Sequence, residues 1–74
     1  MSGLPRISGR ECVRALEHIG FKVVRRKGSH IVLVRESPAA QIVEPDHREL
    51  DSGTLRAIIR HSGLGVDEFK ALMG

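Results

Sequence analysis

The sequence contains no tryptophan or tyrosine and only two phenylalanines. This near-absence of aromatic rings argues against a protein that holds single-stranded nucleic acid by base stacking. A single cysteine, Cys12, excludes an internal disulfide and a zinc site built from several cysteines. No apolar run approaches the roughly 18 residues of a membrane span, and residues 1–10 lack the apolar core of a secretory signal. We therefore expect a cytoplasmic protein with no membrane contact.

The length leaves room for one small domain, which we predict over residues 1–74. Hydrophobic residues make up 41% of the chain and charged residues 28%, values typical of a globular fold rather than of a disordered segment. A chain of this size buries only about 60% of the surface that its unfolded form exposes. Its stability margin is therefore small, and a partner could contribute to it.

Charge is distributed unevenly along the chain. Residues 1–37 carry eight basic and three acidic side chains, whereas residues 38–74 carry four basic and six acidic ones. A basic N-terminal half favours a polyanionic partner, with nucleic acid as the first candidate, although a merely solvated basic surface would look the same.

Helical signals lie at both ends of the sequence. Ser8 and Glu11 form a capping box ahead of a helix predicted over 9–19. A second helix is predicted over 53–61, with Asp51 or Ser52 as its N-cap and Gly63 after its end, and a short third helix follows over about 66–72.

Strand signals fill the middle of the chain. We predict strands over 21–26, 30–35 and 41–44, with a turn at Lys27-Gly28-Ser29 and a loop over 36–40. Alternation in the first strand predicts Phe21 and Val23 on one face and Lys22 and Arg26 on the other. The fold class is therefore α+β: a small three-stranded antiparallel sheet, with helices packed on one face. The predicted core comprises Val13, Leu16, Ile19, Val23, Leu33, Leu55, Ile58, Ile59 and Phe69.

The four histidines are the first candidates for acid–base chemistry. His18 and His61 lie in the last turns of predicted helices, where interaction with the helix dipole is a sufficient explanation. His30 differs, because it follows the predicted turn and has the basic run 25–27 beside it, which could hold a phosphodiester against the imidazole. A plain surface histidine is the alternative for His30. His47, on a loop after Pro45-Asp46, could equally be an exposed loop residue.

Other motifs with a defined chemistry are absent. The sequence has no HExxH motif, no glycine-rich phosphate loop and no GxSxG motif, so we expect no metal and no cofactor. Asp46, Glu49 and Asp51 are better explained as solubilising or helix-capping residues, or as the contact for a basic partner, than as Mg²⁺ ligands. Cys12 is interpreted as a small core residue rather than a nucleophile.

Five stretches spread over about residues 4–72 form one specific pattern. They are Ile7-Ser8-Gly9, Leu16 to Phe21, Arg25-Arg26-Lys27-Gly28-Ser29-His30, Pro45-Asp46-His47 and Gly53 to Arg60. Together they resemble the HicA toxin family, also called YcfA-like. One departure is that family members often carry an aromatic residue shortly after the Gly-Ser-His turn, where this chain has Ile31-Val32-Leu33.

The resemblance implies a fold like that of double-stranded-RNA-binding domains. It also implies the toxin of a type II toxin–antitoxin system, acting as an mRNA interferase whose catalytic residue is His30. The expected partners are RNA, held by Arg25, Arg26, Lys27, Gly28 and Ser29, and an antitoxin of the HicB type that covers the active face. His47 is a possible auxiliary acid. The alternatives are a non-catalytic RNA-binding module and, more weakly, an adaptor that binds only protein.

Overall fold

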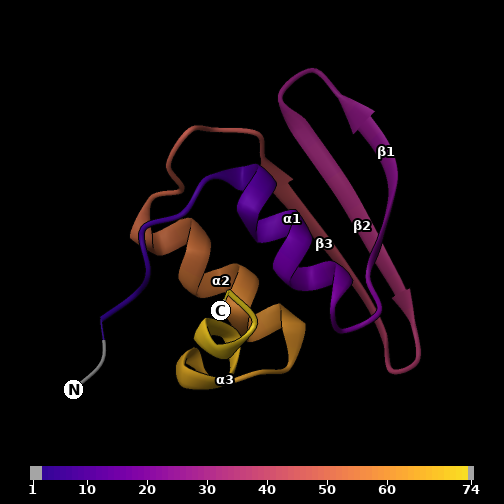
Figure 1. The fold of residues 1–74 in the computed structure, drawn as a ribbon. Coiled ribbons are helices and arrows are strands. Elements are labelled where there is room, and N and C mark those ends of the chain that lie inside the picture. The colour runs from indigo at the N-terminus through magenta and orange to yellow at the C-terminus, as the bar shows by residue number, and fades with distance from the viewer. Residues whose placement is uncertain (1–2, 74) are drawn as a thin grey trace.

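The computed structural model describes residues 3–73, and its elements follow the predicted order. They are α1 (Gly9–Glu17), β1 (Lys22–Lys27), β2 (His30–Glu36), β3 (Ala39–Pro45), α2 (Ser52–Ser62) and α3 (Val66–Ala71). Figure 1 shows α1 and α2 on one side of the sheet, with α3 folded back beside α2. The α+β class is thus confirmed. The single domain over 1–74 stays a prediction, and residues 1, 2 and 74 lie outside the described residues.

Local capping fixes where the two longer helices begin and end. The Ser8 hydroxyl accepts from the Glu11 amide at 3.0 Å, and the Glu11 carboxylate accepts from the Ser8 amide at 2.9 Å, which is the predicted capping box. Asp51 caps α2 by accepting from the Thr54 amide at 2.8 Å, and Gly63 ends α2 with φ of 86°. The first helix ends two residues earlier than predicted, because residues 18–20 form a turn.

The sheet has the order β1-β2-β3 and is antiparallel throughout. Lys27 pairs with His30, so only Gly28 and Ser29 connect the first two strands. Glu36 pairs with Ala39, so the predicted loop over 36–40 was wrong: the connection is the two-residue turn Ser37-Pro38, and the third strand begins at residue 39 rather than 41. A two-residue turn suffices because antiparallel strands lie side by side.

A β-bulge in β1 changes which way its last residues face. The pairing advances from Val23–Leu33 to Arg25–Val32, so Val24 is the extra residue. Arg26 therefore pairs with the buried Ile31, on the same face as Val23. The prediction that Arg26 shares a face with Lys22 was wrong, because the bulge interrupts strict alternation.

The core lies between the helices and the face of the sheet that they cover, here called the inner face. Seven of the nine predicted core residues are buried, while Ile19 and Val23 are partly buried against the same cluster. The cluster also contains Cys12, as expected of a small core residue, and six residues that were not predicted, namely Ile7, Ala15, Phe21, Ile31, Ile42 and Leu50. Arg35 closes one end: its guanidinium stacks 4.5 Å from the Phe21 ring centre and donates to the carbonyls of Pro38 and Ser62.

Candidate nucleic-acid interface

The face of the sheet that the helices leave open, here called the outer face, carries the first candidate residue. His30 is the first residue of β2 and is exposed. Its cross-strand neighbours are Lys27 on β1 and Pro45 on β3. Directly opposed residues in an antiparallel pair point to the same face, so the Lys27 ammonium and the His30 imidazole share this surface.

The turn that precedes His30 explains why glycine stands at position 28. Gly28 has φ of 58°, and no non-glycine residue among those described has a positive φ. A positive φ at only the first of two central residues is typical of a type II′ turn, for which glycine is preferred there. Apart from its neighbours in the chain, no atom would lie within 4 Å of a Cβ at position 28. The backbone conformation, not crowding, therefore requires glycine, and the space beside His30 is open.

The predicted basic run divides between the two faces. Arg25 pairs with Val32, whose other neighbour is the exposed Val43, so Arg25 lies on the outer face with Lys27 and His30. Arg26 lies on the opposite, inner side, at the margin of the sheet beside α1. Only two of the three predicted phosphate-binding cations thus share a face with His30.

Apolar side chains accompany these charges on the outer face. Among residues 3–73, the exposed large hydrophobic side chains are Val24 and Val43, which are 59% and 51% exposed. Val32 is buried but lies outside the core cluster, since it faces away from the helices. A sheet face that mixes valines with a histidine and cations is typical of a surface that another molecule covers.

The other histidines lie apart from this face. His47 lines a shallow hollow with Ser8 and Arg10 at the start of α1, and its backbone carbonyl accepts from the Gly9 amide at 2.8 Å. His30 does not line that hollow. His61 is exposed in the last turn of α2, as expected for a residue that complements the helix dipole.

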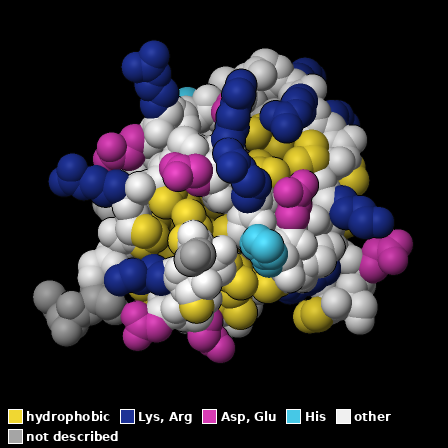
Figure 2. All heavy atoms as spheres, viewed as in Figure 1, with side chains coloured by type: hydrophobic (Ala, Val, Ile, Leu, Met, Phe, Trp, Pro, Cys, Tyr) yellow, Lys and Arg dark blue, Asp and Glu magenta, His cyan; other side chains and the backbone are white. Residues whose placement is uncertain are grey.

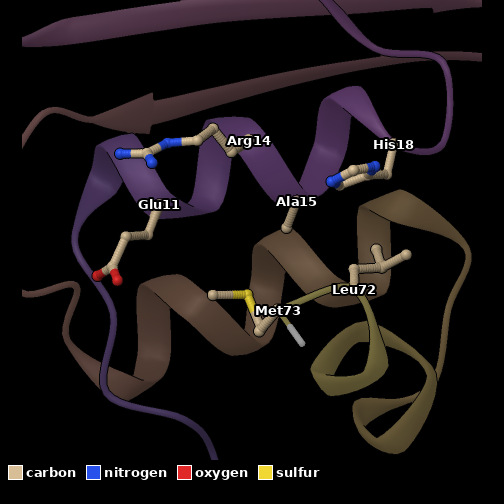
Figure 3. A pocket seen from close by; sticks show the side chains of 6 residues that line it. All are labelled: Glu11, Arg14, Ala15, His18, Leu72 and Met73. Atoms are coloured by element: carbon tan, nitrogen blue, oxygen red, sulfur yellow. The ribbon is translucent and has the colours of Figure 1, made fainter.

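His18 is the C-cap of α1 and lines a second hollow, with Glu11 and Arg14 on the same helix. Figure 3 shows these side chains along α1, with Leu72 and Met73 of the C-terminal segment opposite. The Glu11 carboxylate is already engaged in the capping box. Among residues 3–73, no three His, Cys, Asp or Glu side chains are grouped as a metal ion would require.

A buried carboxylic acid on the inner face was not predicted from the sequence. Glu44 is fully buried on β3, and neither carboxylate oxygen has a hydrogen-bond partner among the described residues. Burial raises its pKa to about 7, and the negative charge of Asp46 adds to the rise; the Cys12 thiol and the Arg26 charge oppose it. Burial likewise raises the pKa of the Cys12 thiol, which is consistent with a core residue rather than a nucleophile. The alternating pattern of β3, with Ile42 and Glu44 on one face, was the signal available.

The chain matches a known protein family. A family model described as the HicA toxin of bacterial toxin–antitoxin matches residues 9–64. The matched stretch contains α1, the whole sheet with its Gly28-Ser29 turn, and α2. No curated protein matches the chain. Within the described part of the chain, no helix is long and apolar enough to cross a membrane.

Proposed function

Because this chain belongs to the HicA toxin family, and is therefore the toxin of a toxin–antitoxin pair, we propose that it is an endoribonuclease with His30 as its general base. The observation that carries the proposal is the position of His30 on the outer face. It is exposed beside an open glycine turn and directly opposite a lysine.

The proposed step is an internal transfer at one RNA phosphodiester. The His30 imidazole takes the proton from a ribose 2′-hydroxyl, and the 2′-oxygen attacks the adjacent phosphorus. A new bond forms between the 2′-oxygen and phosphorus while the bond to the 5′-oxygen breaks. The products are a 2′,3′-cyclic phosphate and a 5′-hydroxyl. A positioned general base typically accelerates such a step about 10²- to 10⁴-fold.

Lys27 and Arg25 supply the positive charge that this step needs. Negative charge develops on the non-bridging phosphate oxygens as the 2′-oxygen attacks, and cations fixed on the same face stabilise it. Lys27 is the direct cross-strand neighbour of His30, and Arg25 lies farther along the same face of β1. The open surroundings of Gly28 leave space at the turn for the phosphate itself.

The proton that the leaving 5′-oxygen requires comes, in this proposal, from water. His47 is the alternative donor, but it lines a hollow at the start of α1 that does not include His30. We therefore keep His47 only as the alternative donor. The chemistry needs no metal, because cationic side chains perform the charge stabilisation.

A non-catalytic RNA-binding module is the second candidate. The observation that favours it is that, among residues 3–73, the cross-strand neighbours of His30 are Lys27 and Pro45, so no second histidine pairs with it on the outer face. A protein that binds RNA by shape and phosphate contacts would use the same cations without needing His30 as a base.

The distinguishing experiment is RNA cleavage by purified, antitoxin-free protein in EDTA, comparing the wild type with His30→Ala. His61→Ala is the matched control, since it removes an exposed histidine from α2. We expect His30→Ala to abolish cleavage and growth inhibition while RNA binding and unfolding change little, because exposed substitutions usually alter stability by only about 0.5 kcal/mol. Undiminished cleavage by folded His30→Ala would refute the catalytic role. A wild type that binds RNA but does not cleave it would favour the binding module.

A further inference from the structure

The β1 bulge leaves a second group of cations on the side of the sheet away from His30. Arg26 there faces Arg10 and Arg14 of α1 across a hollow of about 630 Å³. We call this hollow the α1 groove; its lining is Arg10, Val13, Arg14, Glu17, Arg26 and Asp46. Figure 2 views the molecule from this side and shows Lys and Arg side chains gathered near α1 and the adjoining end of the sheet, with hydrophobic surface beside them.

Two of the three arginines form no ion pair within the described residues, although the Arg26 charge also acts on the buried Glu44 carboxyl. Within residues 3–73 there is one ion pair, between the Arg10 Nε and an Asp46 carboxylate oxygen at 3.5 Å. Arg14 and Arg26 have no such partner, although Glu17 and Asp46 line the same hollow. Arg10 and Arg14 are four residues apart on a helix, so they lie on the same side of α1, about 6 Å apart along its axis.

We propose that the α1 groove is a second phosphate-binding site, which holds the RNA strand on one side of the bond that is cut. The inference rests on the proposed function, because it assigns the groove to the same RNA that His30 acts on. Its substrate is a flexible single strand that passes round the hairpin end, from the outer face into the groove.

The structure provides a short connection between the two surfaces. The Asp46 amide donates to the Ser29 carbonyl at 2.6 Å, and the Asp46 carboxylate contacts Arg10. The rim of the groove therefore begins at the turn that adjoins His30. Only the thickness of one sheet separates the outer face from the groove, so a single strand can contact both. A duplex, which is stiff over a hundred or more base pairs, cannot follow that path.

Guanidinium groups suit this role, because they bind phosphate oxygens through several donors at once and stay charged. An acidic segment of a protein partner is the competing occupant. RNA is favoured because the groove adjoins the proposed cleavage site, so one strand satisfies both surfaces.

The test compares short and long RNA. Two 2′-O-methyl RNAs of mixed sequence, a 4-mer and a 12-mer, lack the attacking hydroxyl and are titrated by fluorescence anisotropy over a range of salt. The variants are Arg14→Gln, Arg14→Lys to restore charge, and Arg56→Gln as an exposed arginine on α2 outside the groove.

We expect Arg14→Gln to bind the 12-mer roughly fivefold more weakly. Its salt slope should be shallower by about 0.7, the change expected for one lost phosphate contact on a single strand. The affinity of Arg14→Gln for the 4-mer should equal that of the wild type. Arg14→Lys should recover most of the affinity for the 12-mer. Arg56→Gln should bind both RNAs with the affinity of the wild type.

Two outcomes would overturn the inference while leaving the proposed function intact. One is a 12-mer affinity and salt slope unaltered by Arg14→Gln, as expected if an acidic protein segment occupies the groove instead. The other is an equal loss of affinity for both RNAs. Failure of the wild type to bind either RNA would refute the proposed function, and the inference with it.

Discussion

Replacing Glu44 by glutamine should remove a large part of the pH dependence of stability. Glu44 is fully buried on β3, and its pKa is raised from 4.5 to about 7. The folded protein therefore holds a proton that the unfolded chain releases between these two values. Stability from this group is fully present below pH 4.5 and is lost as the pH rises to about 7. At 1.36 kcal/mol per unit, the full loss is about 3 kcal/mol.

The neighbours of Glu44 set the direction of this effect. Cys12 from α1 and Arg26 from β1 act to lower its pKa, and Asp46, beyond the end of β3, acts to raise it, but burial is the largest cause. A fully buried carboxylate is strongly disfavoured even with the Cys12 thiol and the Arg26 charge acting on it, so the group is neutralised instead. A domain this small has only a few kcal/mol of stability, so the loss should be easy to detect.

The assay is urea unfolding of wild type and Glu44→Gln at pH 5 and pH 8. Between pH 5 and pH 8, the free energy of unfolding of the wild type should fall by about 2 to 3 kcal/mol more than that of the variant. Taking the difference between the two proteins removes the contribution of every other titrating group. Glu44→Leu should also lack the loss of stability between pH 5 and pH 8. At pH 8 it should be more stable than the wild type, because leucine leaves no polar group unpaired. Parallel pH profiles for wild type and Glu44→Gln would refute the reasoning.

Two further predictions concern the packing of α1 and the antitoxin. Gly9→Ala should destabilise the fold, because a Cβ there would collide with the Pro45 carbonyl oxygen and lie 3.1 Å from a Glu44 carboxylate oxygen. Gly53→Ala, which meets nothing within 4 Å in α2, should raise stability by up to about 1 kcal/mol, and thermal unfolding compares the two. Equal effects would contradict this account. We also propose that a HicB-type antitoxin covers the outer face, so Lys27→Gln and added salt should each slow association in stopped-flow measurements. Rates insensitive to both would contradict that docking.

Local sequence signals determined most of the architecture. Ser8 with Glu11, Asp51 and Gly63 fix helix ends through bonds between neighbours in the chain, so they can be recognised without the fold. The Gly28-Ser29 turn is likewise local, and it brings His30 to the start of a strand. Helical periodicity identified Leu16, Ile58 and Ile59, which are all buried. The family pattern also lay in the sequence, and the family match confirms it.

The tertiary structure decided how the charged residues are grouped. Strict alternation predicted that Arg26 and Val23 lie on opposite faces of the sheet. The bulge at Val24 reverses the faces of Arg25, Arg26 and Lys27, so Arg26 lies on the same face as Val23. Nothing in the local sequence marks that bulge, because it depends on how β1 pairs with β2 and packs against α1. The sequence therefore could not show that Arg25 and Lys27 lie on one face of the sheet and Arg26 on the other. For the same reason it could not predict the α1 groove.

Glu44 is the second such case. Its strand was predicted, and its alternation with Ile42 was visible, yet a glutamate near the end of a strand is usually solvated. It is buried because α1 begins directly over it, where Gly9 lets the helix approach the backbone of Pro45. The pKa of the Glu44 carboxyl is thus set by contacts between segments about 35 residues apart. Propensity and periodicity describe a residue's neighbours along the chain, whereas burial depends on which distant segment covers it.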